Sequence, residues 1–371
     1  MKWSWKLMRI AGIDVYMHAT FLILLGWVGI SHYTQRHSLA DAGSGVVFIV
    51  ALFGIVIMHE LGHALMARRF GIRTRDITLL PIGGIARLER MPDDPKQELL
   101  VALAGPAVNV VLAAVLFVAV APAATLTSLM DVHLAGGKFL ANLMWVNVML
   151  AVFNLIPAFP MDGGRVLRSL LAMRMDYLRA TQIAATTGQG LALVFGFVGL
   201  FTNPFLVFIA LFVWMGAAGE ASMVQIKSAL GGIPIFHVMI TDFRTLAPQD
   251  PLTNAVEHIL AGFQEDFPVV EDGHLVGVLT RTDLTKALAR RGQDTPIAEV
   301  MQRQFQTADP SEMAETVFAR LQECNCHSLP VIQGDRLVGI VTAGNVGEFL
   351  MFQAALKEHA GQSGAAAPSR A

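Results

Sequence analysis

The 371-residue chain is poor in cysteine and has almost no net charge, and each shortage excludes a class of protein. Its two cysteines, Cys324 and Cys326, are separated by one residue, and neither has Cys or His partners at zinc-finger spacing. We therefore expect free thiols in a reducing compartment rather than a disulfide framework. The formal net charge is −2, which indicates neither a nucleic-acid-binding protein nor an acidic tail. No nucleic-acid partner is expected.

Long apolar runs dominate the first 220 residues and are suited to crossing a membrane. We expect about six transmembrane helices, near residues 17–34, 45–67, 98–121, 139–160, 182–201 and 203–219. The stretches 68–96 and 161–181 between them are rich in cationic side chains, including Arg68, Arg69, Arg165 and Arg168. The opposite connections carry only Arg36 and Lys138. The positive-inside rule therefore predicts a multi-pass protein of the cell membrane, in contact with lipid, with both termini in the cytoplasm.

Beyond the apolar part the sequence repeats itself at a constant offset of 62 residues. Phe267-Pro268-Val269-Val270 returns as Leu329-Pro330-Val331-Ile332, and Leu275–Thr280 returns as Leu337–Thr342. Each unit predicts a helix, a short β-branched strand, a glycine turn, a second strand and a closing helix. Neither unit is expected to be stable alone, so the two pair into one domain.

These patterns predict the fold class: a polytopic α-helical membrane domain followed by a cytosolic α/β domain of two repeats. The membrane domain covers residues 1–220 and is followed by a linker, 221–236, that contains glycine and proline. The repeats occupy about 237–292 and 299–352, within a domain of 237–352. The tail, 353–371, is rich in Ala, Gly, Ser and Pro, and we expect it to be disordered.

The second apolar run contains the pattern H-E-x-x-H, with His59, Glu60 and His63. On a helix this spacing places both imidazoles on one face, as zinc requires of two ligands, with the carboxylate beside the metal and its water. An ionisable side chain inside a membrane costs about 2.5–3.5 kcal/mol on insertion scales, which favours a functional site. The alternative is a histidine-bearing helix end that reaches the lipid headgroups.

Asp162 is the candidate for a third ligand. It follows Pro157 and Pro160, which must break the fourth expected span and release backbone carbonyls. Irregular backbone at membrane depth is tolerated only where protein or a water-filled cavity surrounds it. The predicted topology brings this break to the cytoplasmic end, at the depth of the histidine pair. Alternatively, Asp162 caps a helix or a turn before the following glycines.

The two motifs together resemble the site-2 protease family of intramembrane zinc metalloproteases, with H-E-x-x-H in one span and N-x-x-P-x-x-x-x-D-G-G after a later one. The resemblance implies one zinc ion per chain, held by His59, His63 and Asp162, with Glu60 as the catalytic base. It implies a metalloendopeptidase that cuts a client protein in or near a transmembrane helix. The family's usual clients are membrane-tethered regulators of transcription, so the implied process is regulated intramembrane proteolysis.

Two further features concern the substrate. Asn154 would help to hold the unwound client segment in this family, although it could instead cap its own broken helix. Gly83 and Gly84 lie in the stretch Ile82-Gly83-Gly84-Ile85, which could form an extended edge that pairs with the client's backbone. A simple β-turn is the alternative for the glycine pair.

The paired repeats resemble a tandem CBS module, which commonly binds an adenine nucleotide. The family's ribose-binding aspartate follows the strand threonine by three residues. Asp283 meets this requirement after Thr280, whereas Asn345 takes that place after Thr342. At most one complete ribose contact is expected, so a purely structural or dimerising role stays open.

A CBS-regulated ion channel or transporter is the main alternative function, because intramembrane His and Asp could line an ion path. That alternative predicts neither bound zinc nor proteolysis. An inactive membrane scaffold is a third reading, but it gives no reason for Glu60 and Asp162 to stand together.

Overall fold

The computed structural model describes residues 3–81, 83–92, 94–121, 139–262, 264–324 and 326–365. The chain divides into two compact units, Met1–Ser222 and Met223–Ala371. The first contains the candidate metal-binding residues, and the second contains the repeats.

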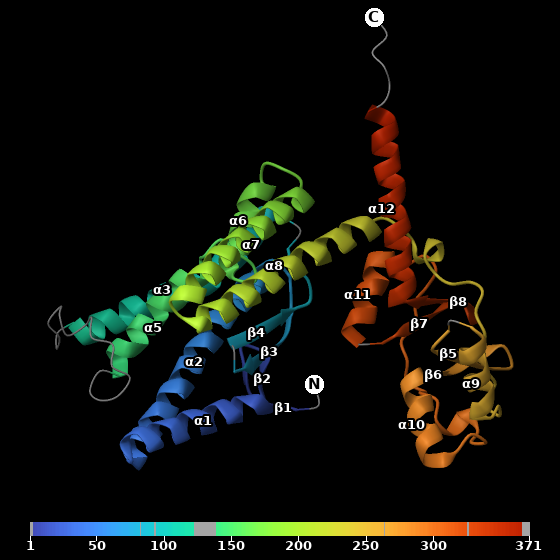
Figure 1. The fold of residues 1–371 in the computed structure, drawn as a ribbon, viewed down its shortest axis with the longest axis horizontal. Coiled ribbons are helices and arrows are strands. Elements are labelled where there is room, and N and C mark those ends of the chain that lie inside the picture. Colours follow the sequence, from blue (N-terminus) through green and yellow to red (C-terminus); the bar gives the residue numbers. More distant parts are fainter. Residues whose placement is uncertain are drawn as a thin grey trace, which may run out of the picture. The chain divides into compact units, whose positions relative to one another are not determined.

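A four-stranded sheet lies at the start of the first unit, with the strand order β1-β2-β3-β4. Its strands are β1 (Ser4–Ile10), β2 (Ile13–His18), β3 (Thr74–Leu80) and β4 (Gly83–Leu88). The outer pairs are antiparallel and β2 pairs with β3 in parallel, because two helices separate these strands in the chain. β4 is therefore an edge strand, and Figure 1 shows the sheet beside α2.

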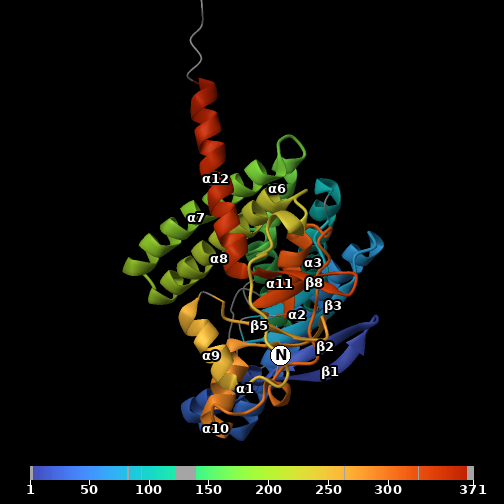
Figure 2. The same cartoon turned by 90° about the vertical axis from the view of Figure 1, so that its right-hand side faces the viewer.

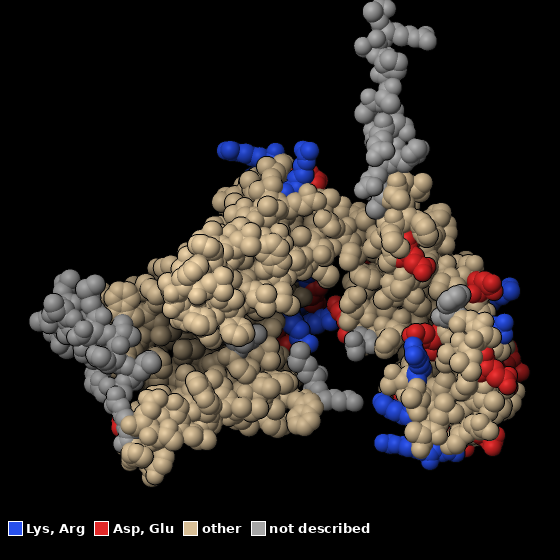
Figure 3. Space-filling view, in the orientation of Figure 1, with Lys and Arg blue, Asp and Glu red and all other residues tan. Residues whose placement is uncertain are grey.

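Seven helices make up the rest of the described first unit. They are α1 (Ala19–Arg36), α2 (Leu39–Arg69), α3 (Pro95–Val120), α5 (Phe139–Asn154), α6 (Asp162–Ala172), α7 (Tyr177–Phe201) and α8 (Pro204–Leu230). In the described part of the chain, four are long and apolar enough to cross a membrane: α2, α3, α7 and α8. The space-filling view shows a surface over these helices with few charged side chains (Figure 3).

The expectation of about six spans is therefore supported for four helices. α1 and α5 cover most of the first and fourth expected ranges, but α5 has only 16 residues and α1 is not among the candidate spans. The stretch 161–181, expected as a loop, contains α6. Arg168 was expected to be a cation of a cytoplasmic loop, but it lies on that helix and is only 1 % exposed.

The sheet packs against the C-terminal half of α2. Ile13, Val15 and Ile77 form a buried cluster with Ala64, the residue after His63. Ser38 caps the start of α2 by accepting a hydrogen bond from the backbone N–H of Asp41, at 3.3 Å. Arg68 and Arg69 in its last turn complement the helix dipole. The histidine pair thus lies on a long helix that is fixed beside the sheet.

The second unit confirms the predicted order of elements. Its first repeat contains α9 (Leu252–Ala261), β5 (Phe267–Glu271), β6 (His274–Leu279) and α10 (Arg281–Arg291). Its second contains α11 (Ala314–Cys324), β7 (Ser328–Gln333), β8 (Arg336–Thr342) and α12 (Ala343–Ala365). Figure 2 shows α12 as a long helix that projects from this unit.

Two boundaries differ from the sequence-based expectation. The expected linker, 221–236, is helical as far as Leu230, because α8 continues through it. The expected disordered tail is helical as far as Ala365, because α12 begins in the second repeat at Ala343 and continues past residue 353. Residues 366–371 lie outside the described part of the chain.

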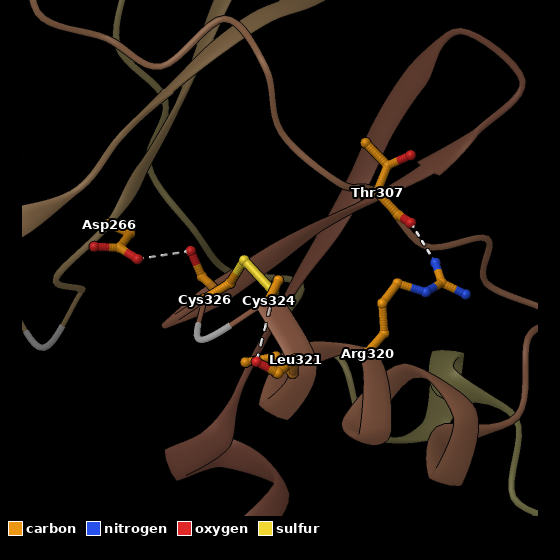
Figure 4. The surroundings of a disulfide bond; sticks show 7 residues. Asp266, Thr307, Arg320, Leu321, Cys324 and Cys326 are labelled. Atoms are coloured by element: carbon orange, nitrogen blue, oxygen red, sulfur yellow. Dashed lines mark hydrogen bonds between the residues drawn. A yellow bond between two sulfur atoms is a disulfide. The ribbon is translucent and has the colours of Figure 1, made fainter. Parts of the chain in front are cut away.

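The expectation of two free thiols is wrong, because a disulfide joins Cys324 and Cys326 (Figure 4). α11 ends at Cys324, and the chain turns there toward β7. This turn brings the two Cα atoms to 5.1 Å, within the usual span of a disulfide.

Candidate metal centre

Three buried side chains from α2 and α6 converge on one point. The Nε2 atoms of His59 and His63 each lie 3.1 Å from Oδ2 of Asp162 and 3.1 Å from each other. All three residues are at most 8 % exposed. Among the described residues, this is a group of the size and type that can hold a metal ion. The sequence predicted these three residues to meet, and the structure brings them together.

Asp162 reaches the histidines because the chain breaks between α5 and α6. α5 ends at Asn154, and the intervening residues include Pro157 and a cis peptide bond before Pro160. Asp162 is then the first residue of α6. Gly163 packs against the preceding loop so tightly that a Cβ atom there would collide with the carbonyl oxygens of Leu155 and Ile156. A glycine is therefore required for the turn that directs Asp162 into the site.

The hydrogen bond of His63 to the backbone tests whether the cluster fits a metal ion. Nδ1 of His63 lies 2.7 Å from the carbonyl oxygen of Val101, which can only accept, so Nδ1 carries the proton. A neutral His63 then presents an unprotonated Nε2, the usual arrangement of a metal-binding histidine. Because the carboxylate is also an acceptor, a metal ion between these atoms would satisfy the lone pairs that meet here.

The spacing of the three atoms also fits zinc. Tetrahedral ligands at the zinc distances of nitrogen and oxygen lie roughly 3.3 Å apart, and the three observed separations are each 3.1 Å. Two imidazoles and one carboxylate leave one tetrahedral position open for water or substrate. The residues present therefore fit a catalytic zinc ion.

Gly105 on α3 lies directly behind the histidine pair. A Cβ atom at this position would collide with Nε2 of both His59 and His63. No motif in the sequence connects Gly105 with the predicted metal ligands. The residue type was the only available signal, since only the absence of a side chain lets α3 approach so closely.

Glu60 belongs to α2, and its side chain faces the edge of the sheet. Its Oε2 accepts a hydrogen bond of 3.2 Å from the backbone N–H of Ala86 in β4. Gly84 is so near that a Cβ atom there would lie 3.0 Å from Cγ of Glu60. Gly83 and Gly84 thus begin an extended edge strand, as one of the two alternatives predicted, rather than forming an isolated turn. Ile82 lies outside the described residues.

The two asparagines near the site differ in their contacts. Asn154 donates from Nδ2 to the carbonyl of Leu150, at 2.9 Å, within its own helix. That contact corresponds to the helix-capping alternative, and its role toward a substrate stays a prediction. Asn109 on α3 is fully buried, and its amide atoms have no hydrogen-bond partner among the described residues.

In the second unit, the carboxylate of Asp283 already has two partners. Thr280 donates from Oγ1 and Gln302 from Nε2 to its Oδ2, both at 2.7 Å. Asn345, at the same place in the second repeat, donates its backbone N–H to Thr342 at 3.1 Å. A carboxylate thus stands at this position in the first repeat only, as the sequence predicted.

Comparisons with known proteins agree with both halves of this arrangement. Residues 47–197 match the model of peptidase family M50, and residues 235–290 and 297–351 match that of the CBS domain. The chain is 31 % identical over 348 residues to zinc metalloprotease MJ0392 of Methanocaldococcus jannaschii, covering 93 % of this chain and 96 % of that protein. A solved structure, the site-2 protease from Methanocaldococcus jannaschii, is 38 % identical and covers 59 % of this chain and 95 % of its own, with a TM-score of 0.45.

Proposed function

Because this chain belongs to peptidase family M50, the site-2 type of zinc metalloprotease, we propose that it hydrolyses a peptide bond in or near a transmembrane helix of a client protein. The convergence of His59, His63 and Asp162 carries this proposal, since these three buried side chains could hold a metal ion. The channel alternative gives no reason for a catalytic carboxylate beside that cluster. The client class that we propose is a membrane-tethered regulator of transcription.

His59, His63 and Asp162 would hold the zinc ion, and Glu60 would serve as the base. A bound zinc ion supplies a Lewis acid that polarises a carbonyl and acidifies water. Glu60 takes the proton from the attacking water and later delivers it to the departing amine. Its hydrogen bond to Ala86 holds the carboxylate at the edge of β4, where a client's backbone would lie.

A client helix must unwind before cleavage, because its carbonyls are engaged in its own hydrogen bonds. The open edge of β4 offers replacement partners to the released backbone. N–H groups of alternate residues in a strand point to the same side, so Gly84 points outward together with Ala86. Gly83 leaves room for an approaching chain, since a Cβ atom there would meet nothing within 4 Å, and Asn154 would contact the client beyond it.

The test is co-expression of the full chain with single-span candidate clients, comparing wild type with Glu60→Gln. Loss of the carboxylate should slow cleavage by about 10²- to 10⁴-fold, while the zinc content stays at that of wild type because the ligands are intact. Equal persistence of every tested client with both proteins, at full zinc content, would contradict the proposal. Purified protein without zinc would favour the channel.

We further propose a multi-pass location in the cell membrane with both termini in the cytoplasm. Arg68 and Arg69 at the end of α2 support this orientation, since they follow His63 by five and six residues on the same helix. About six spans are proposed, with α1 and α5 added to the four candidate helices. Cleavage is then expected close to the cytoplasmic face.

The CBS unit is proposed to bind an adenine nucleotide near Asp283 and so to modulate cleavage, and to support a dimer. Asp283 supports this proposal because it stands three residues after Thr280, at the start of α10. Asp283→Asn should weaken AMP binding about tenfold, the usual cost of a charge-assisted hydrogen bond, as measured by calorimetry. Asp272→Asn, in the β5–β6 turn, is the matched control. Equal AMP affinity of the two variants would assign Asp283 a purely structural role.

A further inference from the structure

A buried ion cluster lies beside the metal centre, on the far part of α6 from Asp162. Arg168 donates from Nε to Oε1 of Glu98 on α3, at 2.9 Å, and a second guanidinium nitrogen bonds the same oxygen. Its Nη1 donates to Oε2 of Glu220 on α8, at 3.1 Å. Glu98 is fully buried and Arg168 is 1 % exposed. One guanidinium therefore joins three helices.

Two aromatic rings complete the surroundings of Arg168. Its guanidinium carbon lies 5.0 Å from the ring centre of Phe159 and 5.1 Å from that of Tyr177, within the range of a cation–π contact. Phe159 belongs to the broken segment that leads into Asp162. Arg168 is therefore in contact with the segment on one side of Asp162 and belongs to the helix on the other.

Glu98, the main partner of Arg168, belongs to the part of α3 that orients the histidines. It lies one turn before Val101, whose carbonyl fixes the ring of His63. Gly105, which backs both histidines, follows one further turn along the same helix. The Arg168–Glu98 pair thus connects the helix that presents Asp162 with the helix that orients the histidines.

We propose that Arg168, held by Glu98 and Glu220, is a positioning residue that keeps Asp162 at the distance from His59 and His63 that a metal ion needs. This inference rests on the proposed zinc site. A buried ion pair contributes little net stability compared with apolar residues of similar volume. The pair does fix the orientation of α6 relative to α3, because a guanidinium bonds carboxylates only in defined orientations.

Glu220 gives the cluster a connection beyond the metal centre. It lies on α8, which passes without interruption from the first unit through Ser222 into the second. Arg165 on α6 also faces Glu220, at 3.8 Å. A rotation or shift of α8 would therefore act on α6 through two arginines, and α6 carries Asp162.

The experiment measures Co²⁺ binding by visible absorption, because Co²⁺ reports the geometry of its ligands directly. The full-length double variant Arg168→Met/Glu98→Leu removes the pair without leaving a buried charge. Its thermal unfolding should stay close to that of wild type, whereas its Co²⁺ affinity should fall about 10- to 100-fold, as for other residues that orient metal ligands. Its absorption spectrum should change as well.

Two single variants keep the test decisive if the double variant does not fold. Glu220 is partly exposed, so Glu220→Gln should fold normally and still weaken Co²⁺ binding about threefold, a fraction of the usual cost of such residues. Arg174→Gln removes an exposed arginine just beyond α6 and should leave both affinity and spectrum unchanged. Wild-type affinity and spectrum in Glu220→Gln, and in the double variant if it folds, would overturn the proposal. A wild-type protein that binds no Co²⁺ would instead contradict the zinc site itself.

Discussion

At the scale of single residues, the metal centre depends on groups that hold the ligands as much as on the ligands themselves. The carbonyl of Val101 fixes the proton on Nδ1 of His63 and so leaves Nε2 free for a cation. Gly105 contributes by lacking a side chain. Both act through α3, which carries no ligand in the described cluster, so substitutions on that helix should alter metal binding without touching a ligand.

Gly105→Ala should remove metal binding, because the new methyl group would occupy the space of both Nε2 atoms. We expect a loss of affinity of about tenfold or more, measured as zinc per chain after dialysis against a competing chelator. Gly54→Ala is the matched control, since a Cβ atom at position 54 of α2 meets nothing within 4 Å. Equal zinc retention by the two variants would show that α3 can move away from the histidines.

At the scale of elements, the site requires one broken helix and one open strand. The break between α5 and α6 turns Asp162 toward α2, and β4 leaves one edge without a strand partner. In the proposed function, the broken helix serves metal binding and the open strand serves substrate binding. These functions should therefore be separable by mutation.

Ile85→Pro should lower cleavage of a client by about tenfold or more, because proline cannot donate to β3 and distorts the edge strand. Zinc content should be unchanged, since the ligands lie on α2 and α6. Ile85→Val retains the strand and should cleave like wild type. If Ile85→Pro cleaves normally, the client does not pair with β4.

At the scale of the whole molecule, each repeat of the second unit contributes buried residues to the hydrophobic core of the other. Leu230, Ile235 and Val238 precede α9, the first helix of the first repeat, yet they are buried in the core of the second repeat. Ile297 and Met301 precede α11, the first helix of the second repeat, and are buried in the core of the first repeat. Backbone bridges follow the same exchange, joining Ile240 to Ile340 and Val278 to Gln302.

This exchange predicts that one repeat cannot fold without the other. A fragment of residues 223–303 retains the whole first repeat but leaves Leu230, Ile235 and Val238 without their core. It should show no cooperative thermal transition by circular dichroism, whereas residues 223–365 should unfold cooperatively. A sharp transition in the shorter fragment would mean that the exchanged segments contribute little to stability.

Local patterns in the sequence were sufficient to predict that His59, His63 and Asp162 converge, and to predict the repeats and the order of their elements. The four-residue spacing of His59 and His63 determines a shared helix face, and the offset of 62 residues determines a doubled fold. Paired prolines before Asp162 indicated the helix break. Each of these patterns involves residues close together in the chain or a segment that the sequence repeats.

Tertiary structure alone decided which distant groups hold those residues in place. Val101 lies 38 residues from His63, and Glu98 lies 70 residues from Arg168, and no local pattern records such contacts. Arg168 illustrates the difference: its charge suggested a cytoplasmic loop, but packing against Glu98, Glu220, Phe159 and Tyr177 buried it. Cys324 and Cys326 met because α11 ends at Cys324 and does not continue through Cys326. The sequence thus determined which groups could bind a metal, whereas the packing of α3, α6 and α8 decided how they are held.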